Sequence, residues 1–529
     1  MMAARPPLAR PTQRAAPAGP AWRTWLAPAL ILVAGGIFLA RLAGCGLLGW
    51  DTYPLILTSR IQSFGDLAHN LTQRLMHGLY PSEFYRPVVN FSFALDHGLW
   101  GMRPFGYHFM STLLFAGCAA ALLRLLRRLA GSAAWIAPLA GTLVFLLHPS
   151  HFEVIPVPSR RAEILSGMFM ALSLSAQLAP RRLLNRGVSW LPASFALLAF
   201  LSKESAFVLP ALTFLVVFLY APLPEANQRA GHALRALRPH ALALALALAA
   251  RLAVLGTIGG HQTTTLAGSL NRLPYYFAAM LKWVLLPQEV MQQAPAAVWL
   301  LALLAAALAA TALAFKGWRR APRPRSARAA PEGERGPHPL RLGLAGGAWL
   351  FLIGFVYSIA AEMSPWYMLL PVMATAIICG SLAEALVRVL RFERGFPRMA
   401  ASAAIALLAV LLIWQARYSA LIHPYRQWRD ATTVAGEFLD QTRAQLTQAP
   451  PGTVLEGPPI PTWVLPRPGE PVMPRIYGAA IFAEYTIQAW ALLEFPGRRI
   501  DVKVAPETAH AKAAPDGVLL LLTKKLPGY

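Results

Sequence analysis

The feature that most constrains this chain is a series of apolar runs that recurs along most of its length. A helix of about 20 apolar residues crosses the hydrocarbon core of a bilayer. The predicted spans are 25–48, 107–126, 132–147, 164–180, 188–202, 205–221, 239–258, 296–315, 342–361, 365–387 and 399–418. The series therefore predicts an all-α polytopic membrane protein with about eleven transmembrane helices.

The excess of basic residues indicates which side of the membrane each link occupies. The net charge is +24, and much of the Lys and Arg excess sits in short links between the apolar runs. Cytoplasmic links are enriched in Lys and Arg, so we expect the basic tail 1–24 and the loop 316–341 in the cytoplasm. The same distribution speaks against nucleic-acid binding, since the charge is not gathered on one domain.

Alternation of the spans leaves several polar segments on the outer face. The segment 273–289 has a short apolar core, and we expect it to lie on the outer surface as an interfacial helix. The membrane domain 25–418 then has its outer loops at 49–106 and 148–163. The tail 419–529 contains strand-like pieces split by Pro and Gly, which predicts a small outer-face α+β domain.

The cysteines do not suggest a disulfide framework, because Cys45, Cys118 and Cys379 all lie in apolar runs. The segment 42–45, Leu-Ala-Gly-Cys, is similar to a bacterial lipoprotein cleavage site. We nevertheless expect the first apolar run to be a retained transmembrane helix, because it is longer than a signal-peptide core.

The outer loops carry acids, histidines and aromatic residues, whereas the inner loops carry almost only Arg. Chemistry is therefore expected outside. Asp51 directly follows the first span, where a carboxylate is either a solvated interfacial acid or a general base facing a lipid-linked substrate.

The polar loop 148–163, "HPSHFEVIPVPSRRAE", is bounded by two apolar runs. His148, His151 and Glu153 have a spacing that would suit a divalent metal, but without a fourth ligand the pattern is weak, and hydrogen bonding in a polar cleft is the favoured alternative. No cofactor is firmly predicted. Consecutive Arg160 and Arg161 cannot share a helix face, so we expect at most one to point into such a cleft.

Three charged residues interrupt apolar segments: Lys203, Glu204 and Arg251. Charges at membrane depth are costly and are usually functional, with ion pairing or snorkelling as the alternative. A phosphate would be a natural partner for Lys203 and Arg251. Tyr85 and Arg86 precede a predicted amphipathic helix on the membrane surface, and Arg86 would alternatively contact a head group.

Taken in order, these segments resemble the type C glycosyltransferases (GT-C), and among them the bacterial relatives of the protein O-mannosyltransferases and of the transmembrane O-mannosyltransferases that carry tetratricopeptide repeats. The matching segments are "WDTYPLI", "YRPVVNFSFALDHGLWGMRPFGYHF", "LLHPSHFEVIPVPSRRAEIL", "FLSKESAFVLP" and "EMSPWYMLLP".

The resemblance implies an enzyme of the bacterial cytoplasmic membrane that takes a sugar from a polyprenyl-phosphate carrier on the outer face. The sugar passes to a hydroxyl of a protein, glycan or lipid acceptor, with inversion. The N-terminus would be cytoplasmic and the C-terminal domain periplasmic. Asp51 corresponds to the family's catalytic base.

The expected donor-phosphate ligands are Lys203, Arg251 and one of Arg160 or Arg161, since fixed cations stabilise a departing phosphate. The loop 148–163 would cover a cleft and face Asp51. The expected sugar or acceptor contacts are His148, His151, Glu153, Glu163, Arg86, Tyr85, Glu204 and Glu362.

The sequence departs from the family pattern at two places. Thr52 stands where the family usually has a second acid, and "VIPVPSRR" replaces an apolar-Trp and Ser-Gly-Arg segment. Two other functions stay open. One is a transporter or flippase of polyprenyl-linked sugars, and the other is a non-catalytic scaffold that binds lipid.

Overall fold

The structure is a computed structural model that describes residues 22–80, 82–131, 134–184, 189–258, 266–285, 339–360, 364–423, 425–448, 454–457, 461–465, 479–497, 501–504, 509–513 and 519–523. Its helices are α1 Trp22–Leu42, α2 Thr52–Ser59, α3 Phe64–Thr72, η1 Leu75–Gly78, α4 Pro87–Trp100, α5 Pro104–Ala130, α6 Ile136–Leu147, α7 His151–Val154, η2 Pro158–Arg160, α8 Arg161–Gln177, α9 Pro180–Leu184, α10 Trp190–Phe200, η3 Glu204–Val208, α11 Leu209–Tyr220, α12 Ala226–Leu255, α13 Leu266–Leu285, α17 Pro339–Ala360, η5 Pro365–Met368, α18 Leu369–Phe392, α19 Phe396–Ala416, α20 Arg426–Gln448 and α21 Glu484–Glu494.

Six helical segments in the described residues are long and apolar enough to cross a membrane: Trp22–Leu42, Pro104–Ala130, Ala226–Leu255, Pro339–Ala360, Trp366–Arg391 and Phe396–Ala416. Shorter apolar helices cover Ile136–Leu147, Trp190–Phe200 and Glu204–Tyr220, and α8 covers the predicted span at 164–180. The predicted all-α polytopic membrane fold is confirmed. The predicted span at 296–315 lies outside the described residues.

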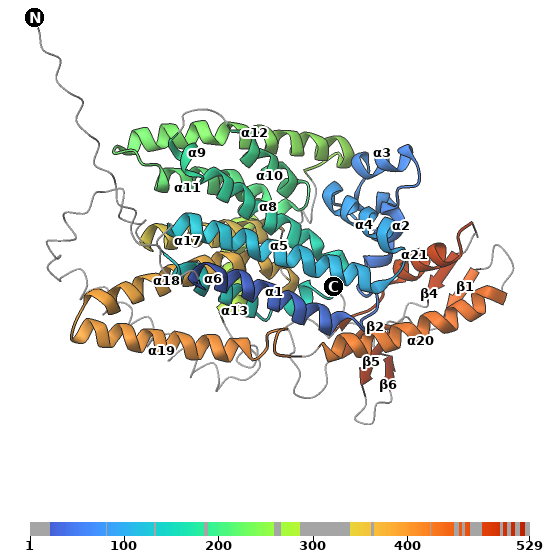
Figure 1. Cartoon of the computed structure of the whole chain (residues 1–529). Coiled ribbons are helices and arrows are strands. Elements are labelled where there is room, and N and C mark those ends of the chain that lie inside the picture. Colours follow the sequence, from blue (N-terminus) through green and yellow to red (C-terminus); the bar gives the residue numbers. More distant parts are fainter. Residues whose placement is uncertain are drawn as a thin grey trace, which may run out of the picture.

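The helices pack into one bundle with a common apolar core (Figure 1). Within it α17 packs on α18, α6 on α18, and α8 on α5. The predicted interfacial segment forms α13, which packs along α17. Among the described residues, α13 is not one of the six helical segments that are long and apolar enough to cross a membrane. Its membrane position stays a prediction.

The C-terminal part lies at one end of the bundle, where α21 packs on α2 (Figure 1). The strands β1 Val454–Gly457 and β4 Asp501–Val504 form a parallel pair. The strands β2 Pro461–Leu465, β3 Ala479–Ala480, β5 Ala509–Ala513 and β6 Leu519–Thr523 form a sheet of order β3-β2-β5-β6.

The strand-like pieces predicted in the tail correspond to strands of the structure, among them β1, β2, β4 and β6, whereas the sequence did not predict α20. This helix buries Trp428, Ala431, Val434 and Ala435, which belong to the same apolar core as the membrane bundle. Because the core is shared, the C-terminal part is anchored on the elements that carry the outer loops.

Candidate active site

Asp51 lies in a tight turn between the end of the first span and α2. Gly49 in this turn has φ +94°, and a Cβ at that position would lie 2.4 Å from Cγ1 of Val157. Glycine therefore permits both the backbone conformation and the close approach of the loop 148–163. The prediction that this loop approaches Asp51 agrees with this packing.

Asp51 occupies the N-cap position of α2, yet its carboxylate makes no capping hydrogen bond. An Asp at this position usually accepts a bond from the first helical turn. Instead, Oδ1 of the half-buried Asp51 accepts a hydrogen bond of 2.7 Å from the Tyr485 hydroxyl on α21. The neighbouring Thr52 is buried and donates its hydroxyl to the Leu48 carbonyl at 2.6 Å, so it adds no second acid.

Opposing effects act on the pKa of Asp51. Burial raises it above the usual value, whereas the hydrogen bond from Tyr485 and the positive charges of Arg160 and Arg86 lower it. Burial has the largest effect, so the carboxyl binds a proton more readily than an exposed aspartate does. A base with a pKa moved toward neutrality suits general-base catalysis.

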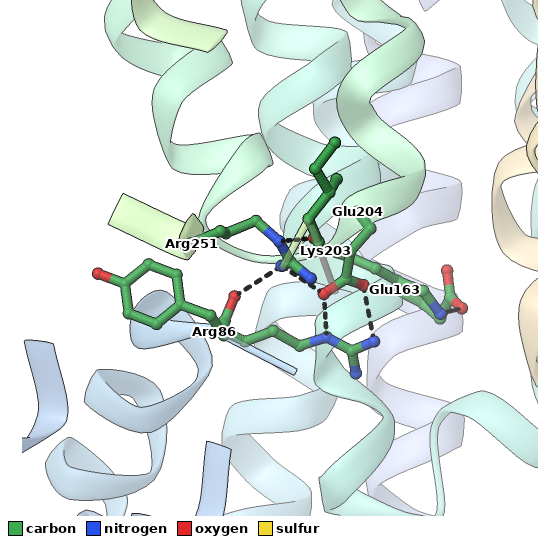
Figure 2. A network of polar contacts seen from close by, with 7 residues as sticks. Arg86, Glu163, Lys203, Glu204 and Arg251 are labelled. Carbon is green, nitrogen blue, oxygen red and sulfur yellow. Dashed lines mark hydrogen bonds and ion pairs between the residues drawn. The ribbon is translucent and has the colours of Figure 1, made fainter. Parts of the chain in front are cut away.

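One carboxylate, that of Glu204, holds two arginines (Figure 2). Arg86 donates to it from Nη2 at 2.8 Å, and Arg251 donates from Nη1 at 2.7 Å. Arg251 also donates to the carbonyl groups of Tyr85 and Ile258. Two cations share one anion, so this triad carries a net positive charge.

Lys203 pairs with Glu163 of α8, not with its chain neighbour Glu204 (Figure 2). The Lys203 ammonium group also lies 4.1 Å from the centre of the Tyr367 ring. The alternative to a ligand role for Lys203 was an ion pair, and the structure gives it one with Glu163. The structure pairs Glu204 with arginines from two other elements, because the extended backbone at Lys203 turns its side chain toward α8.

Arg160 is loosely held. Its guanidinium lies over the Trp366 ring at 3.5 Å from the centroid, and its Nη2 is 3.8 Å from Glu153. Its Nε is buried without a hydrogen-bond partner among the described residues. The favourable interaction between Arg160 and Asp51 links this cation to the candidate base.

Arg161 is fully buried and occupied by structural contacts. Its Nη2 lies 2.5 Å from the Asp96 carboxylate, and it donates to the Tyr107 carbonyl at 2.8 Å and to the Ser111 hydroxyl at 3.1 Å. Of the two consecutive arginines, Arg160 has the fewer protein contacts, whereas the donors of Arg161 are directed at protein acceptors. These contacts favour Arg160 over Arg161 as the phosphate ligand, and that assignment stays a prediction.

The two histidines of the loop face the protein interior. Nε2 of His148 lies 3.1 Å from the Val284 carbonyl, and that of His151 lies 2.5 Å from the Phe145 carbonyl. Burial lowers the pKa of His148 to about 4 and that of His151 to about 3. Both are therefore neutral at pH 7 and are held by the backbone, which favours a structural role, and their contact with a sugar stays a prediction.

The same loop gives no support for the weaker metal hypothesis. Glu153 pairs with Arg160, and burial raises its pKa to about 7. Within the described ranges no three His, Cys, Asp or Glu side chains gather as a metal site.

The remaining predicted contacts have separate environments. Tyr85 is buried and donates its hydroxyl to the Leu71 carbonyl at 2.7 Å, which indicates a structural role for its hydroxyl. Arg86 contacts both Glu204 and the Phe84 ring. Glu362 lies outside the described residues.

Sequence reasoning missed three residues of this region: Tyr485, Trp366 and Asp96. Trp366 lies in the quoted "EMSPWY" segment, where an aromatic residue beside an acid was a usable signal. Tyr485 lies on an element 434 positions after Asp51, and no local pattern joins the two.

Comparison with known proteins shows a local similarity. Over 90 residues the chain is 36% identical to the protein O-mannosyl-transferase TMTC2 of Mus musculus, which is 17% of this chain and 10% of that protein. The Homo sapiens protein is 34% identical over 90 residues. The chain thus matches about a tenth of the length of these relatives. The resemblance to transmembrane O-mannosyltransferases is confirmed over this matched segment. No protein family model matches.

Two solved structures show a general similarity over most of the chain. ArnT from Cupriavidus metallidurans bound to undecaprenyl phosphate aligns with 94% of each chain at 16% identity and a TM-score of 0.41. The oligosaccharyltransferase AglB from Archaeoglobus fulgidus, in complex with an inhibitory peptide and a dolichol-phosphate, aligns with 90% of this chain and 64% of its own at 14% identity and a TM-score of 0.38. At these values neither carries an argument about function.

Proposed function

We propose that this protein is an integral membrane glycosyltransferase of the GT-C superfamily that transfers a sugar from a polyprenyl-phosphate carrier to an acceptor hydroxyl, with inversion. It acts at the outer face of a bacterial cytoplasmic membrane, with its N-terminus in the cytoplasm and its C-terminal part in the periplasm. The local similarity to O-mannosyl-transferases supports transfer of a sugar.

The observation that carries this proposal is the position of one half-buried carboxylate beside a group of cations. Asp51 interacts with Arg160 and Arg86, and Arg86 joins it to Glu204 and Arg251. A base and fixed positive charge are the two groups that this transfer needs, one for the attacking hydroxyl and one for the leaving phosphate.

The donor phosphate binds between Arg86 and Arg160 in this proposal. Their side chains are 13% and 10% exposed, whereas that of Arg251 is 1% exposed, so the first two are the accessible guanidinium groups. Arg251 binds Glu204, which also holds Arg86, and so adds positive charge next to the proposed phosphate site. Lys203 is neutralised by Glu163 and contributes less positive charge than the sequence alone indicated.

The reaction then proceeds as a single displacement. Asp51 accepts the proton of the acceptor hydroxyl while its oxygen forms a bond to the anomeric carbon. The bond from that carbon to the phosphate oxygen breaks, and the electron pair leaves with polyprenyl phosphate. Arg160 and Arg86 stabilise the negative charge that develops on the phosphate.

The test is transfer of radiolabelled sugar by the purified full-length protein, with a panel of polyprenyl-phosphate sugars and host envelope acceptors. Removing a general base lowers turnover by about 10²- to 10⁴-fold, and Asp51→Asn should show this loss without a change in the melting temperature.

The matched control is Asp66→Asn, which makes the same change at a partly exposed acid of the same outer loop, where the carboxylate caps α3. This variant should transfer like the wild type. Turnover of Asp51→Asn within about twofold of wild type would exclude Asp51 as the base. Donor binding by the wild type without transfer to any acceptor would favour a scaffold or a flippase.

A further inference from the structure

The segment that begins α21 is bound to every residue of the turn that carries Asp51. The Gly49 amide donates to the Ile481 carbonyl at 3.2 Å, and the Thr486 hydroxyl donates to the Trp50 carbonyl at 2.6 Å. The Tyr485 hydroxyl donates to Asp51. Three consecutive residues of the turn are thus held by a segment from the far end of the chain.

Aromatic packing fixes the Tyr485 ring in this position. Its centre lies 5.8 Å from that of Tyr80, and Phe482 packs at 6.3 Å from Tyr53 of α2. Ala480 packs against Trp50 and Trp366, and Trp366 lies under Arg160. The C-terminal part therefore contacts both the candidate base and the ring that supports a phosphate-binding arginine.

We infer that Tyr485 is a positioning residue for Asp51, so that the C-terminal part completes the active site of the membrane domain. Its hydroxyl holds Oδ1 of the carboxylate and leaves Oδ2 to take the proton of the acceptor. This inference rests on the proposed function, and it assigns to the C-terminal part a role in the reaction itself. A general base must be held within hydrogen-bond reach of the proton that it removes.

The hydrogen bond also has an electrostatic consequence. A donor bonded to the charged form of a carboxyl favours that form, and Tyr485 lowers the pKa of Asp51 against the effect of burial. Arg160 and Arg86 act in the same direction from η2 and from the residue before α4. Loss of the Tyr485 hydroxyl alone should therefore raise the pKa of Asp51 and move the acidic limb of the kcat profile to higher pH.

The test compares Tyr485→Phe with the wild type across the pH range, using the purified full chain and the donor found active above. We expect a loss of about tenfold in kcat at neutral pH, the size of effect expected for one hydrogen bond to a charged group, and a shift of the acidic limb toward higher pH. KM for the donor should change less than kcat, because the Tyr485 hydroxyl contacts the base.

Tyr80→Phe is the matched control. It removes a hydroxyl from the ring that packs on Tyr485 and leaves the bond to Asp51 in place. This variant should keep the wild-type rate and pH profile. An equal loss in both variants would indicate disturbed aromatic packing and would overturn the inference.

A measurement without turnover separates this inference from the proposed function. The infrared band of the Asp51 carboxyl, assigned by its absence in Asp51→Asn, should titrate at higher pH in Tyr485→Phe. An unchanged midpoint would overturn the inference, even where Asp51→Asn is inactive and the proposed function stands. A shifted midpoint in a protein that transfers no sugar would leave the Tyr485 contact established and the proposed function refuted.

Discussion

Arg160 and Arg161 are adjacent in the chain, and the structure uses them differently. Arg161 is fully buried, 2.5 Å from Asp96, and donates to groups on α5. Arg160 keeps 10% of its side chain exposed and lies 3.8 Å from its carboxylate partner, Glu153. The first fastens α4 and α5 to α8, whereas the second rests on an aromatic ring beside the candidate base.

The difference shows that burial and the number of partners separate a structural cation from a candidate ligand. A buried guanidinium whose donors are all directed at protein acceptors would have to lose those bonds to bind phosphate. A guanidinium held by a ring and one distant carboxylate keeps donors for a ligand. Three substitutions sharpen this comparison.

The largest expected effect is on stability, from Arg161→Met. Removing one partner of a buried ion pair costs about 3–5 kcal/mol, because the other charge stays buried without compensation. Chemical unfolding in detergent micelles should show a loss of this order. The activity of the protein that remains folded should be unchanged.

The double variant Arg161→Met with Asp96→Leu provides the control, since replacing both members of a buried pair by apolar residues is often neutral. Recovery of most of the lost stability would confirm the structural role. An Arg161→Met protein of normal stability that binds donor poorly would contradict the comparison.

The second effect depends on pH and concerns Glu153, which is buried and whose pKa burial raises to about 7 from the usual 4.5. The folded state then holds a proton more tightly than the unfolded state. The carboxyl therefore costs no stability below about pH 4.5, and the cost grows as pH rises through about 7.

Glu153→Gln removes that cost. Its stability relative to wild type should increase between pH 5 and pH 8 by up to about 3 kcal/mol. Unfolding curves at the two pH values measure it. A difference that is constant with pH would show that Glu153 is already ionised at pH 5 and paired with Arg160.

The smallest expected effect is that of Arg160→Ala on transfer. Loss of a charge-assisted hydrogen bond to the phosphate should lower kcat/KM by about 10- to 100-fold, equivalent to about 1.5–3 kcal/mol. Stability should change little, because the ion pair with Glu153 is long. Transfer kinetics at varied donor concentration measure the loss.

Arg160→Lys should recover part of this activity by restoring the charge. The matched control is Arg103→Ala, which removes an exposed arginine from the same outer region and should keep the wild-type rate of transfer. A normal rate for Arg160→Ala with a large loss of stability would reverse the assignment of the two arginines.

Sequence reasoning located the helices of the fold because hydropathy is a local signal. The predicted spans at 107–126 and 342–361 correspond to Pro104–Ala130 and Pro339–Ala360. It was less successful in the tail, because α20 is amphipathic and polar and contains no apolar run that would mark it as a helix. Its apolar face is visible only once the surface that it covers is known.

For the site, the sequence singled out charged residues that the structure places in ion pairs, but it could not tell which acid pairs with which cation. Lys203 and Glu204 are neighbours in the chain, yet they pair with different residues. Lys203 has an extended backbone and Glu204 begins η3, and the structure directs Lys203 to Glu163 and Glu204 to two arginines.

By itself the sequence determined that this chain is a helical membrane protein, and it predicted that Arg160 and Arg161 face different ways and that polar chemistry lies in the loops 49–106 and 148–163. These properties follow from hydropathy and helical period, which act over a few residues. Only the tertiary structure decided which acid holds which cation and placed Tyr485 on Asp51. Such contacts join elements distant in the chain, and they form only when the bundle and the C-terminal part pack on one core.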